Sequence, residues 1–293
     1  MKRKYIVVTG GAGFIGSNLI ELLLKKTKSQ IISIDNYSSG SKKNHINNKK
    51  VKYIKADTNN IFKILKNYEN LISDLFHFGE FSRIAESFNS LDKCFNSNIL
   101  GTTKIIDFCS KNKIKILYSA TSSAFNDKEN LSPYAFSKSQ NVKLIKNYNS
   151  WFDLDYKIFY FYNVYGENQI MTGHMATVIG IFEKCYKDNK SLPVVKPGHQ
   201  IRNFTYIKDI INGCYVGWKK GRHKEYLLKS EKEYTIYEVA KLFSKKIIFL
   251  KSRPGERHKS YYPNELKTNN TLGLKFKTDL KDYIKKITST YNS

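Results

Sequence analysis

The stretch GGAGFIG at residues 10–16 decides the fold of this chain. It follows an apolar run, Tyr5–Thr9, that predicts a buried strand, and it leads into Phe14–Leu24, whose apolar residues recur at helical spacing. A strand, a glycine-rich turn and a helix in this order bring backbone N–H groups and the positive end of a helix dipole to one point. Such a point can bind a pyrophosphate, because the glycines allow a tight turn and a close approach of the phosphate.

A second predicted strand, Gln30–Ile34, ends in Asp35, nineteen residues after Gly16. An acidic residue at about this distance accepts hydrogen bonds from the adenosine ribose of a dinucleotide. A carboxylate also repels a 2′-phosphate. The pattern therefore predicts a dinucleotide site that binds NAD in preference to NADP.

The composition is that of a folded protein. With 293 residues, of which 41% are apolar and 14% aromatic, the chain can bury a full core. No apolar run approaches the roughly twenty residues that a membrane span needs, so we expect no membrane partner. The cysteines show no CxxC spacing and fall in predicted helices, which favours reduced thiols in a cytoplasmic protein and predicts no metal site. They are Cys94, Cys109, Cys185 and Cys214.

The formal charge of +25 raises the question of a nucleic-acid partner. Six of the 50 basic residues are arginines, and the lysines are spread along the whole chain among many Asn and Ile. Because no basic helix and no aromatic–basic stacking surface stands out, we expect no specific nucleic-acid partner. Since arginine is scarce, the positions of the arginines are informative.

Strands and helices alternate in the first half of the chain. This alternation predicts an α/β fold, a Rossmann-type doubly wound parallel sheet with helices on both faces. Ligands of such sheets bind beyond the carboxyl ends of the strands. The further elements predicted here are strands at Val51–Lys55, Leu75–Phe78, Ile114–Ser119 and Tyr156–Phe161 and helices at Leu91–Lys111 and Pro133–Trp151.

The alternation loosens after about Gly166, where short strands mix with helices. We therefore predict a dinucleotide-binding domain over residues 1–165 and a smaller C-terminal α/β lobe over 166–293, interleaved at an approximate boundary. This lobe would pack on the sheet and close the cleft. Its predicted elements are strands at Leu192–Lys196, Tyr226–Leu228 and Ile247–Leu250 and a helix at Thr235–Lys245 that Thr235 caps.

The segment SPYAFSK at residues 132–138 carries the predicted chemistry. Ser132 suits an N-cap and Pro133 the first helical position, so Tyr134 and Lys138 lie one turn apart on one helix face. An ammonium beside a phenol lowers the phenol's pKa, and such a phenol can act as a general base on an alcohol. A chain this rich in Tyr and Lys produces the pair by chance, but here it follows a dinucleotide motif and the fifth predicted strand.

That fifth strand ends in YSATSSAF, residues 118–125. Hydroxyls at the carboxyl end of a strand point into the cleft where a sugar hydroxyl would lie. We expect Thr121 to share a hydrogen bond with the reacting oxygen.

Together these motifs resemble the extended short-chain dehydrogenase/reductases of the nucleotide-sugar epimerase/dehydratase family, and the similarity runs nearly end to end. It includes the glycine turn, Asp35-Asn36, Asp57, His77-Phe78-Gly79, Asn98 with Gly101-Thr102, the hydroxyl-rich strand end, Tyr134 with Lys138, NVYG at 163–166, Arg202-Asn203-Phe204 with Asp209, and RPGE at 253–256.

The resemblance implies roles for individual residues. Asp57 would meet the adenine of NAD, and Asn163, Arg202 and Arg253 would hold the diphosphate of a nucleotide sugar, since arginine forks bind phosphate bidentately. Ser122 would contact the substrate, and Tyr134, Lys138 and Thr121 would form the catalytic group. The cofactor contacts predicted from the motifs and the resemblance are Gly10, Gly13, Phe14, Ile15, Gly16, Asp35, Asn36, Asp57, Phe78, Gly79, Asn98 and Lys138.

The strand end distinguishes members of the family. The 4,6-dehydratases carry Thr-Asp-Glu there and use both carboxylates to eliminate water, whereas UDP-glucuronate decarboxylases resemble Thr-Ser-Glu. This chain has Thr121-Ser122-Ser123 and so is most similar to 4-epimerases such as UDP-glucose 4-epimerase. We expect a 4-epimerase of a UDP-hexose. In similar enzymes, helices like those predicted at Leu91–Lys111 and Pro133–Trp151 form a four-helix bundle between two subunits, which predicts a homodimer.

Other interpretations stay open at this point. A 4-ketoreductase or a 2-epimerase of a deoxysugar nucleotide uses the same Tyr and Lys, and a non-catalytic NAD-binding sensor would keep only the dinucleotide motif. Glu80 stands in a segment that is often small and apolar; it would pair with Arg83 or recognise a sugar hydroxyl or amino group. The loop at 126–131 is shorter than in most relatives.

Overall fold

An eight-stranded sheet with every described pairing parallel forms the centre of the computed structural model, which describes residues 4–125, 131–255, 257–263 and 265–292. The strand order is β14-β11-β6-β5-β4-β1-β2-β3. Strands β2 and β3 thus lie on one side of β1, and β4 with the later strands lies on the other side. The strands are β1 (Tyr5–Thr9), β2 (Gln30–Asp35), β3 (Val51–Lys55), β4 (Ile72–His77), β5 (Lys115–Thr121), β6 (Tyr156–Phe161), β11 (Glu225–Leu228) and β14 (Lys267–Thr268).

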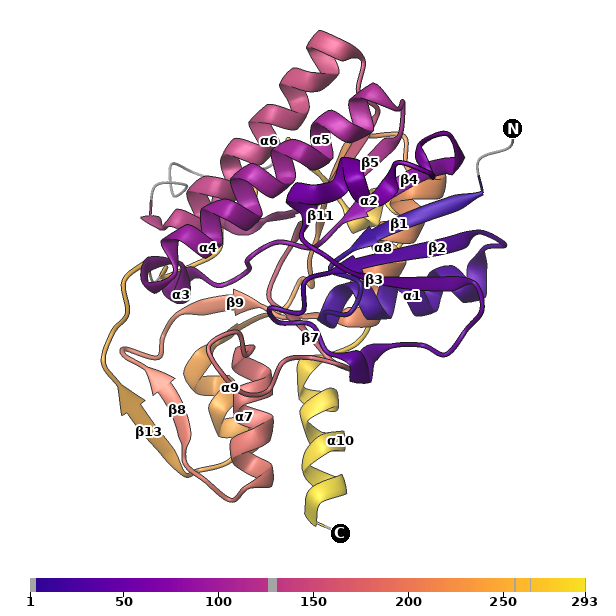
Figure 1. Cartoon of the computed structure of the whole chain (residues 1–293). Coiled ribbons are helices and arrows are strands. Elements are labelled where there is room, and N and C mark those ends of the chain that lie inside the picture. Colours follow the sequence, from indigo (N-terminus) through magenta and orange to yellow (C-terminus); the bar gives the residue numbers. More distant parts are fainter. Residues whose placement is uncertain (1–3, 126–130, 256, 264, 293) are drawn as a thin grey trace.

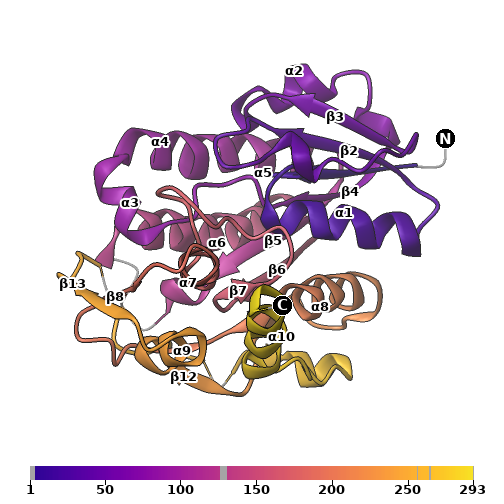
Figure 2. The same cartoon turned by 90° about the horizontal axis from the view of Figure 1, so that it is seen from below.

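Helices cover both faces of this sheet, as Figures 1 and 2 show, and the predicted doubly wound fold is confirmed. One face packs against α1 (Phe14–Lys26) and α8 (Ile207–Lys220), whose side chains share a core with β1 and β6. The other face packs against α2 (Ile61–Leu65), α5 (Thr102–Lys111) and α6 (Pro133–Phe152).

The helix predicted at Leu91–Lys111 is a run of three pieces. It consists of α4 (Leu91–Phe95), a π-helical turn η4 (Asn96–Gly101) and α5. A π-turn inserts one extra residue into the helical ladder and often marks a functional position. Here it contains Asn98, whose carbonyl accepts a hydrogen bond from the Asn141 side chain of α6 at 2.7 Å.

Helix α6, which carries Tyr134 and Lys138, begins as predicted. The Ser132 side chain accepts a hydrogen bond from the Ala135 N–H at 3.1 Å, and Pro133 occupies the first turn of α6. Likewise α9 (Ile236–Phe243) begins at Thr235, whose side chain and that of Glu238 form a capping box.

Residues after 165 divide between the large sheet and a smaller layer. Strands β11 and β14 extend the sheet beyond β6. The remaining elements lie in the lower part of Figure 1. Their buried apolar side chains form a separate cluster. These elements are α7 (Val178–Lys187), α9, α10 (Leu280–Asn292) and the short strand pairs β7 (Val164–Tyr165) with β10 (Thr205–Tyr206), β8 (Leu192–Val195) with β13 (Ile247–Leu250), and β9 (Ile201–Asn203) with β12 (Glu233–Thr235).

Within the described ranges, the model contains no helix that is long and apolar enough to cross a membrane. All four cysteines are free thiols; Cys94, Cys109 and Cys214 are buried and Cys185 is partly buried. The loop at 126–130 and Glu256, which figure in the sequence comparison, lie outside the described residues.

The glycine turn packs backbone directly on backbone. Gly10 has φ +70°, and a Cβ there would lie 2.8 Å from the Gly79 nitrogen at the end of β4. At Gly16, in the first turns of α1, a Cβ would lie 2.2 Å from the Gly10 carbonyl oxygen. Gly16 therefore permits the close approach of α1 to the turn, and Gly10 permits the close approach of the turn to the end of β4.

Replacing Gly16 with alanine should destabilise the protein, although alanine favours helix by about 1 kcal/mol. The methyl group would meet backbone atoms, which cannot move aside as a side chain can, and α1 would have to shift off the turn. We expect Gly16→Ala to lower the free energy of unfolding by at least about 1 kcal/mol in denaturant titrations. Gly13→Ala is the control, because its Cβ comes no closer than 3.1 Å to another residue. Equal stability of the two variants would contradict this packing.

Candidate active site

A cavity lies beyond the carboxyl ends of the central strands, where doubly wound sheets bind ligands. Its wall comes from the glycine turn after β1 and from the residues that follow β2, β3, β4 and β5, together with the start of α6. Of the predicted cofactor and catalytic residues it includes Gly10, Gly13, Phe14, Ile15, Gly16, Asp35, Asn36, Asp57, Phe78, Gly79, Thr121, Tyr134 and Lys138.

Asp35 is held rigidly at one end of this main cavity. One carboxylate oxygen accepts the Ala12 N–H at 3.0 Å and the other accepts the Tyr37 N–H at 2.8 Å. Burial raises the pKa of Asp35, and these backbone hydrogen bonds oppose the rise. The neighbouring Asn36 side chain donates to the Asp57 carboxylate at 2.6 Å. Polar acceptors thus gather at this end, as binding of an adenosine requires.

The glycine turn fits the pyrophosphate of a dinucleotide. Helix α1 begins at Gly13 without a side-chain cap, so no side chain competes for the N–H groups of its first turn. Side chains at Gly10 or Gly16 would fill the space between the turn and its neighbours. The residues present therefore fit NAD.

Asn98 is the one predicted cofactor residue that does not line the main cavity. It is fully buried, and its side chain bonds the backbone N–H of Phe81 at 2.7 Å, the Phe81 carbonyl at 3.0 Å and the Ser137 hydroxyl at 3.1 Å. Its side chain therefore joins the π-turn to the loop after β4 and to α6.

Tyr134 faces the far end of the main cavity. Burial and the negative charge of Glu80 raise the pKa of its hydroxyl, whereas a hydrogen bond with the Thr121 side chain and the charges of Arg83 and Arg257 lower it. The net effect is a pKa of Tyr134 above its ordinary value. The sequence argument expected Lys138 to lower it, but the Lys138 ammonium is paired with a carboxylate and its charge is compensated.

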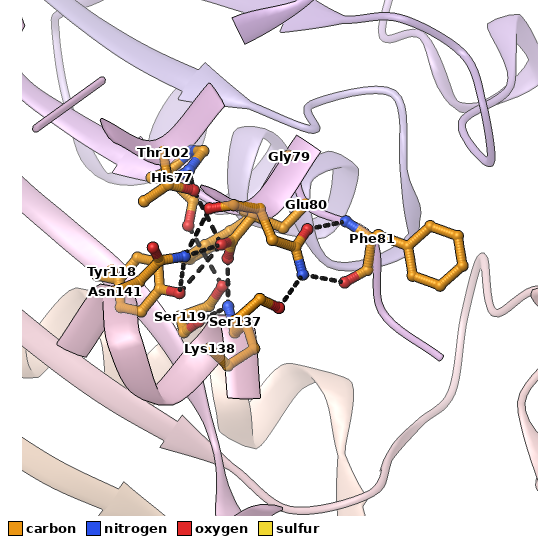
Figure 3. A network of polar contacts seen from close by, with 12 residues as sticks. His77, Gly79, Glu80, Phe81, Thr102, Tyr118, Ser119, Ser137, Lys138 and Asn141 are labelled. Atoms are coloured by element: carbon orange, nitrogen blue, oxygen red, sulfur yellow. Dashed lines mark hydrogen bonds and ion pairs between the residues drawn. The ribbon is translucent and has the colours of Figure 1, made fainter. Parts of the chain in front are cut away.

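That carboxylate belongs to Glu80, which follows β4. Figure 3 shows the two side chains in contact within a network of polar groups. Lys138 Nζ donates to Glu80 Oε2 and to the Ser119 carbonyl, and it lies 4.2 Å from the centre of the Tyr118 ring. The exposed fractions of the Lys138 and Glu80 side chains are only 5% and 3%. Burial lowers the pKa of Lys138, and Glu80 opposes this shift.

The expected pairing of Glu80 with Arg83 is therefore wrong. The Arg83 guanidinium donates instead to the carbonyls of Met175, at 2.9 Å, and Ser82, at 2.8 Å. It lines the main cavity and also a second cavity beside it. Glu80 pairs with Lys138 because both side chains are buried, and an unpaired buried charge costs several kcal/mol.

The second cavity adjoins the main one and continues it toward the smaller layer. Among the shared lining residues are Asn163 and Arg202, whereas Arg253 lines the second cavity alone. The Arg202 guanidinium donates to the carbonyls of Ile201 at 2.8 Å and Arg257 at 2.7 Å, which holds its fork in place. Asn163 and Arg202 are thus brought to the junction between the two cavities, whereas Arg253 lies in the second cavity.

Ser122 lies at the end of β5, where Arg257 holds it. The Arg257 guanidinium donates to the Ser122 carbonyl at 3.0 Å and approaches its hydroxyl at 3.5 Å. Thr121 Oγ1 donates to the Ser123 hydroxyl and accepts the Ser123 N–H, both at 3.2 Å. The strand end therefore presents hydroxyls that are fixed by their own hydrogen bonds.

The sequence analysis did not place Arg83 and Arg257 in the main cavity. It also did not predict the pairing of Glu80 with Lys138. The scarcity of arginine was the available signal. Four of the six arginines line the two cavities: Arg83, Arg202, Arg253 and Arg257.

Comparison with known proteins gives concordant findings. The profile described as "NAD dependent epimerase/dehydratase family" matches residues 6–228. A putative UDP-glucose 4-epimerase of Methanocaldococcus jannaschii is 31% identical in an alignment of 304 positions that covers 96% of each chain. The structure of a UDP-N-acetylglucosamine 4-epimerase from Methanobrevibacter ruminantium is 26% identical, with a TM-score of 0.82 over 100% of this chain and 98% of its own. The UDP-glucose 4-epimerase of Thermotoga maritima shares the fold, with 23% identity and a TM-score of 0.86 over 98% of each chain.

The fixed Asp35 carboxylate yields a prediction about cofactor choice. A 2′-phosphate at this end would face a negative charge, so the purified protein should release NAD on denaturation and should bind NAD at least about tenfold more tightly than NADP. Asp35→Asn keeps the shape of the side chain and should narrow this preference, mainly through tighter binding of NADP. Mass spectrometry of the released nucleotide and calorimetric titrations test both points, and preferential binding of NADP by the unmodified protein would refute them.

Proposed function

The chain belongs to the NAD dependent epimerase/dehydratase family, and from this premise we propose that it interconverts the C4 epimers of a UDP-hexose. The observation that supports this activity most directly is the end of β5, where Thr121, Ser122 and Ser123 lie beside Tyr134 in the main cavity. Hydroxyls can orient a sugar alcohol, but they cannot replace the carboxylates that dehydration requires. The relatives named above are described as 4-epimerases, which agrees with the proposal.

In the proposed reaction Tyr134 takes the proton of the sugar 4-hydroxyl. Its own hydroxyl is hydrogen-bonded with Thr121, so both groups can contact the same substrate oxygen. Bound NAD would supply the acceptor and donor of the C4 hydride, and its positive ring would favour the phenolate of Tyr134. Arg202 and Arg253 hold the diphosphate while the 4-keto sugar presents its other face, and Tyr134 then returns the proton.

Removing the Tyr134 hydroxyl tests this assignment. Tyr134→Phe keeps the ring and its packing, so folding should be unchanged, whereas epimerisation of the UDP-hexose should slow by about 10²–10⁴-fold. The rate is measured by NMR of the two epimers, with thermal unfolding as the control for folding. Activity close to that of the unmodified protein would mean that another group acts as the base. Stoichiometric consumption of NADH or NADPH by the unmodified enzyme would favour the 4-ketoreductase.

A second proposal concerns assembly. Large apolar side chains are exposed on α6 and on the π-turn that precedes α5: Trp151 is 60% exposed, Phe152 59% and Leu100 58%. Leu91 and Phe136, on α4 and α6, are also exposed. Apolar surface of this kind on neighbouring helices is typical of a protein interface, so we propose that two copies pack these helices together as a homodimer.

The dimer proposal predicts that charge on this surface separates the subunits. The unmodified protein should be a dimer at micromolar concentration in light scattering, and the double variant Leu100→Glu/Phe136→Glu should be a folded monomer. Ile248→Glu is the control, since Ile248 is 52% exposed on β13 in the smaller layer and should leave the dimer intact. A monomeric unmodified protein would refute the proposed interface.

The state of the cysteines supports a proposal about location. All four are free and most are buried, so the fold needs no disulfide. We infer that the protein works in the reducing cytoplasm.

A further inference from the structure

The Glu80 carboxylate is the meeting point of a buried network that the proposed reaction does not by itself explain. Oε2 accepts from the Lys138 ammonium, and Oε1 accepts from Thr102 at 2.9 Å, from Tyr118 at 3.0 Å and from Asn141 at 2.9 Å. These donors come from α5, β5 and α6, and Figure 3 shows them converging on the carboxylate. Only an ionised carboxylate can accept all four, because a protonated one must itself donate.

The neighbouring histidine agrees with an ionised Glu80. Since the Thr102 hydroxyl donates to Glu80, it must accept from His77 Nε2 at 2.8 Å. The Thr9 hydroxyl already accepts the N–H groups of Phe78 and Gly79, so it donates to His77 Nδ1 at 2.7 Å. His77 is therefore neutral, and burial lowers its pKa to about 4. These hydrogen bonds are consistent with a single arrangement of protons, in which Glu80 is negatively charged and Lys138 is positively charged.

The other charges at this end of the main cavity are positive. Arg83 and Arg257 line it beside Tyr134 and Lys138, and both act electrostatically on the Tyr134 hydroxyl. Among the described residues that line the cavity, the remaining carboxylates are Asp35, at the end of β2, and Asp57, which follows β3. Strand β2 is three positions from β5 in the sheet, which places Asp35 roughly 14 Å from the end of β5. Among these lining residues Glu80 is thus the carboxylate at the Tyr134 end, where three positive groups lie.

We propose that Glu80 is a positioning residue that anchors the Lys138 ammonium and serves as the counter-charge that lets the site accept the positively charged ring of oxidised NAD. The inference rests on the proposed function in one respect: a hydride acceptor has to lie beside the Tyr134 base. Two of the three ammonium protons of Lys138 are directed to Glu80 and Ser119, which leaves one for a ligand in the main cavity.

The proposal has a consequence for the two redox forms of the cofactor. Reduced NAD carries a neutral nicotinamide ring and oxidised NAD a cationic one, so a nearby negative charge favours the oxidised form. At an effective dielectric constant near 20, a unit charge in the wall of the cavity interacts with a cationic ring strongly enough to change a dissociation constant several-fold. A shift of at least about fivefold is therefore expected when the Glu80 charge is removed.

The test compares dissociation constants for NAD and NADH, measured by calorimetry at pH 7. For Glu80→Gln the ratio of the NAD constant to the NADH constant should rise at least about fivefold over that of the unmodified protein. Tyr118→Phe removes one hydrogen bond to Glu80 without removing a charge, so its ratio should stay within about twofold. A merely structural role for Glu80 would weaken both ligands equally and leave the ratio unchanged, which would overturn the proposal.

A variant that keeps the charge guards against misfolding of Glu80→Gln. Glu80→Asp leaves a carboxylate beside Lys138, so no buried ammonium is unpaired, and its ratio should stay within about twofold of that of the unmodified protein. A ratio that rises at least about fivefold in Glu80→Asp would also overturn the proposal. Binding of the two cofactor forms requires no sugar turnover, so a failure here is distinguishable from a failure of the proposed epimerisation.

Discussion

The ion pair between Lys138 and Glu80 is the interaction on which the Tyr134 end of the main cavity depends. Both side chains are almost completely buried, and a single buried charge in either position would be destabilising without the other. Through Thr102, Tyr118 and Asn141 the pair joins α5 and α6 to the loop that follows β4. The position of Tyr134, one turn before Lys138 on α6, is therefore tied to the sheet and not only to its own helix.

At the opposite end, the site depends on close backbone packing. Gly16 lets α1 approach the turn after β1, Gly10 lets that turn pack on the end of β4, and Asp35 is fixed by two backbone N–H groups. One end of the main cavity is thus shaped by backbone and a rigid acid, and the other by a buried ion pair with its hydrogen-bonded partners. This division suits a cofactor that must be held tightly at its adenosine while its nicotinamide meets a base and a sugar.

Local patterns predicted much of this structure. The bounds of β1, β3 and β6 coincide with the periodic apolar runs, and Ser132 with Pro133 marks the beginning of α6, because these signals act over a few residues. The π-turn inside Leu91–Lys111 has no such signal, since it depends on what packs against the helix. The partner of Glu80 lies 58 positions away and could be found only from the folded chain. Arg257 likewise reaches Ser122 across 135 positions.

The most direct test of the account follows the hydrogen at C4. UDP-glucose deuterated at C4 is incubated with the enzyme in ordinary water, and the product is examined by NMR and mass spectrometry. Transient oxidation at C4 with return of the same hydride predicts UDP-galactose that retains deuterium at C4, with no net consumption of NADH. Loss of the label to water, or entry of solvent deuterium at C5 or C6 in the reverse-labelled experiment, would show a carbanion route and contradict the proposed epimerisation.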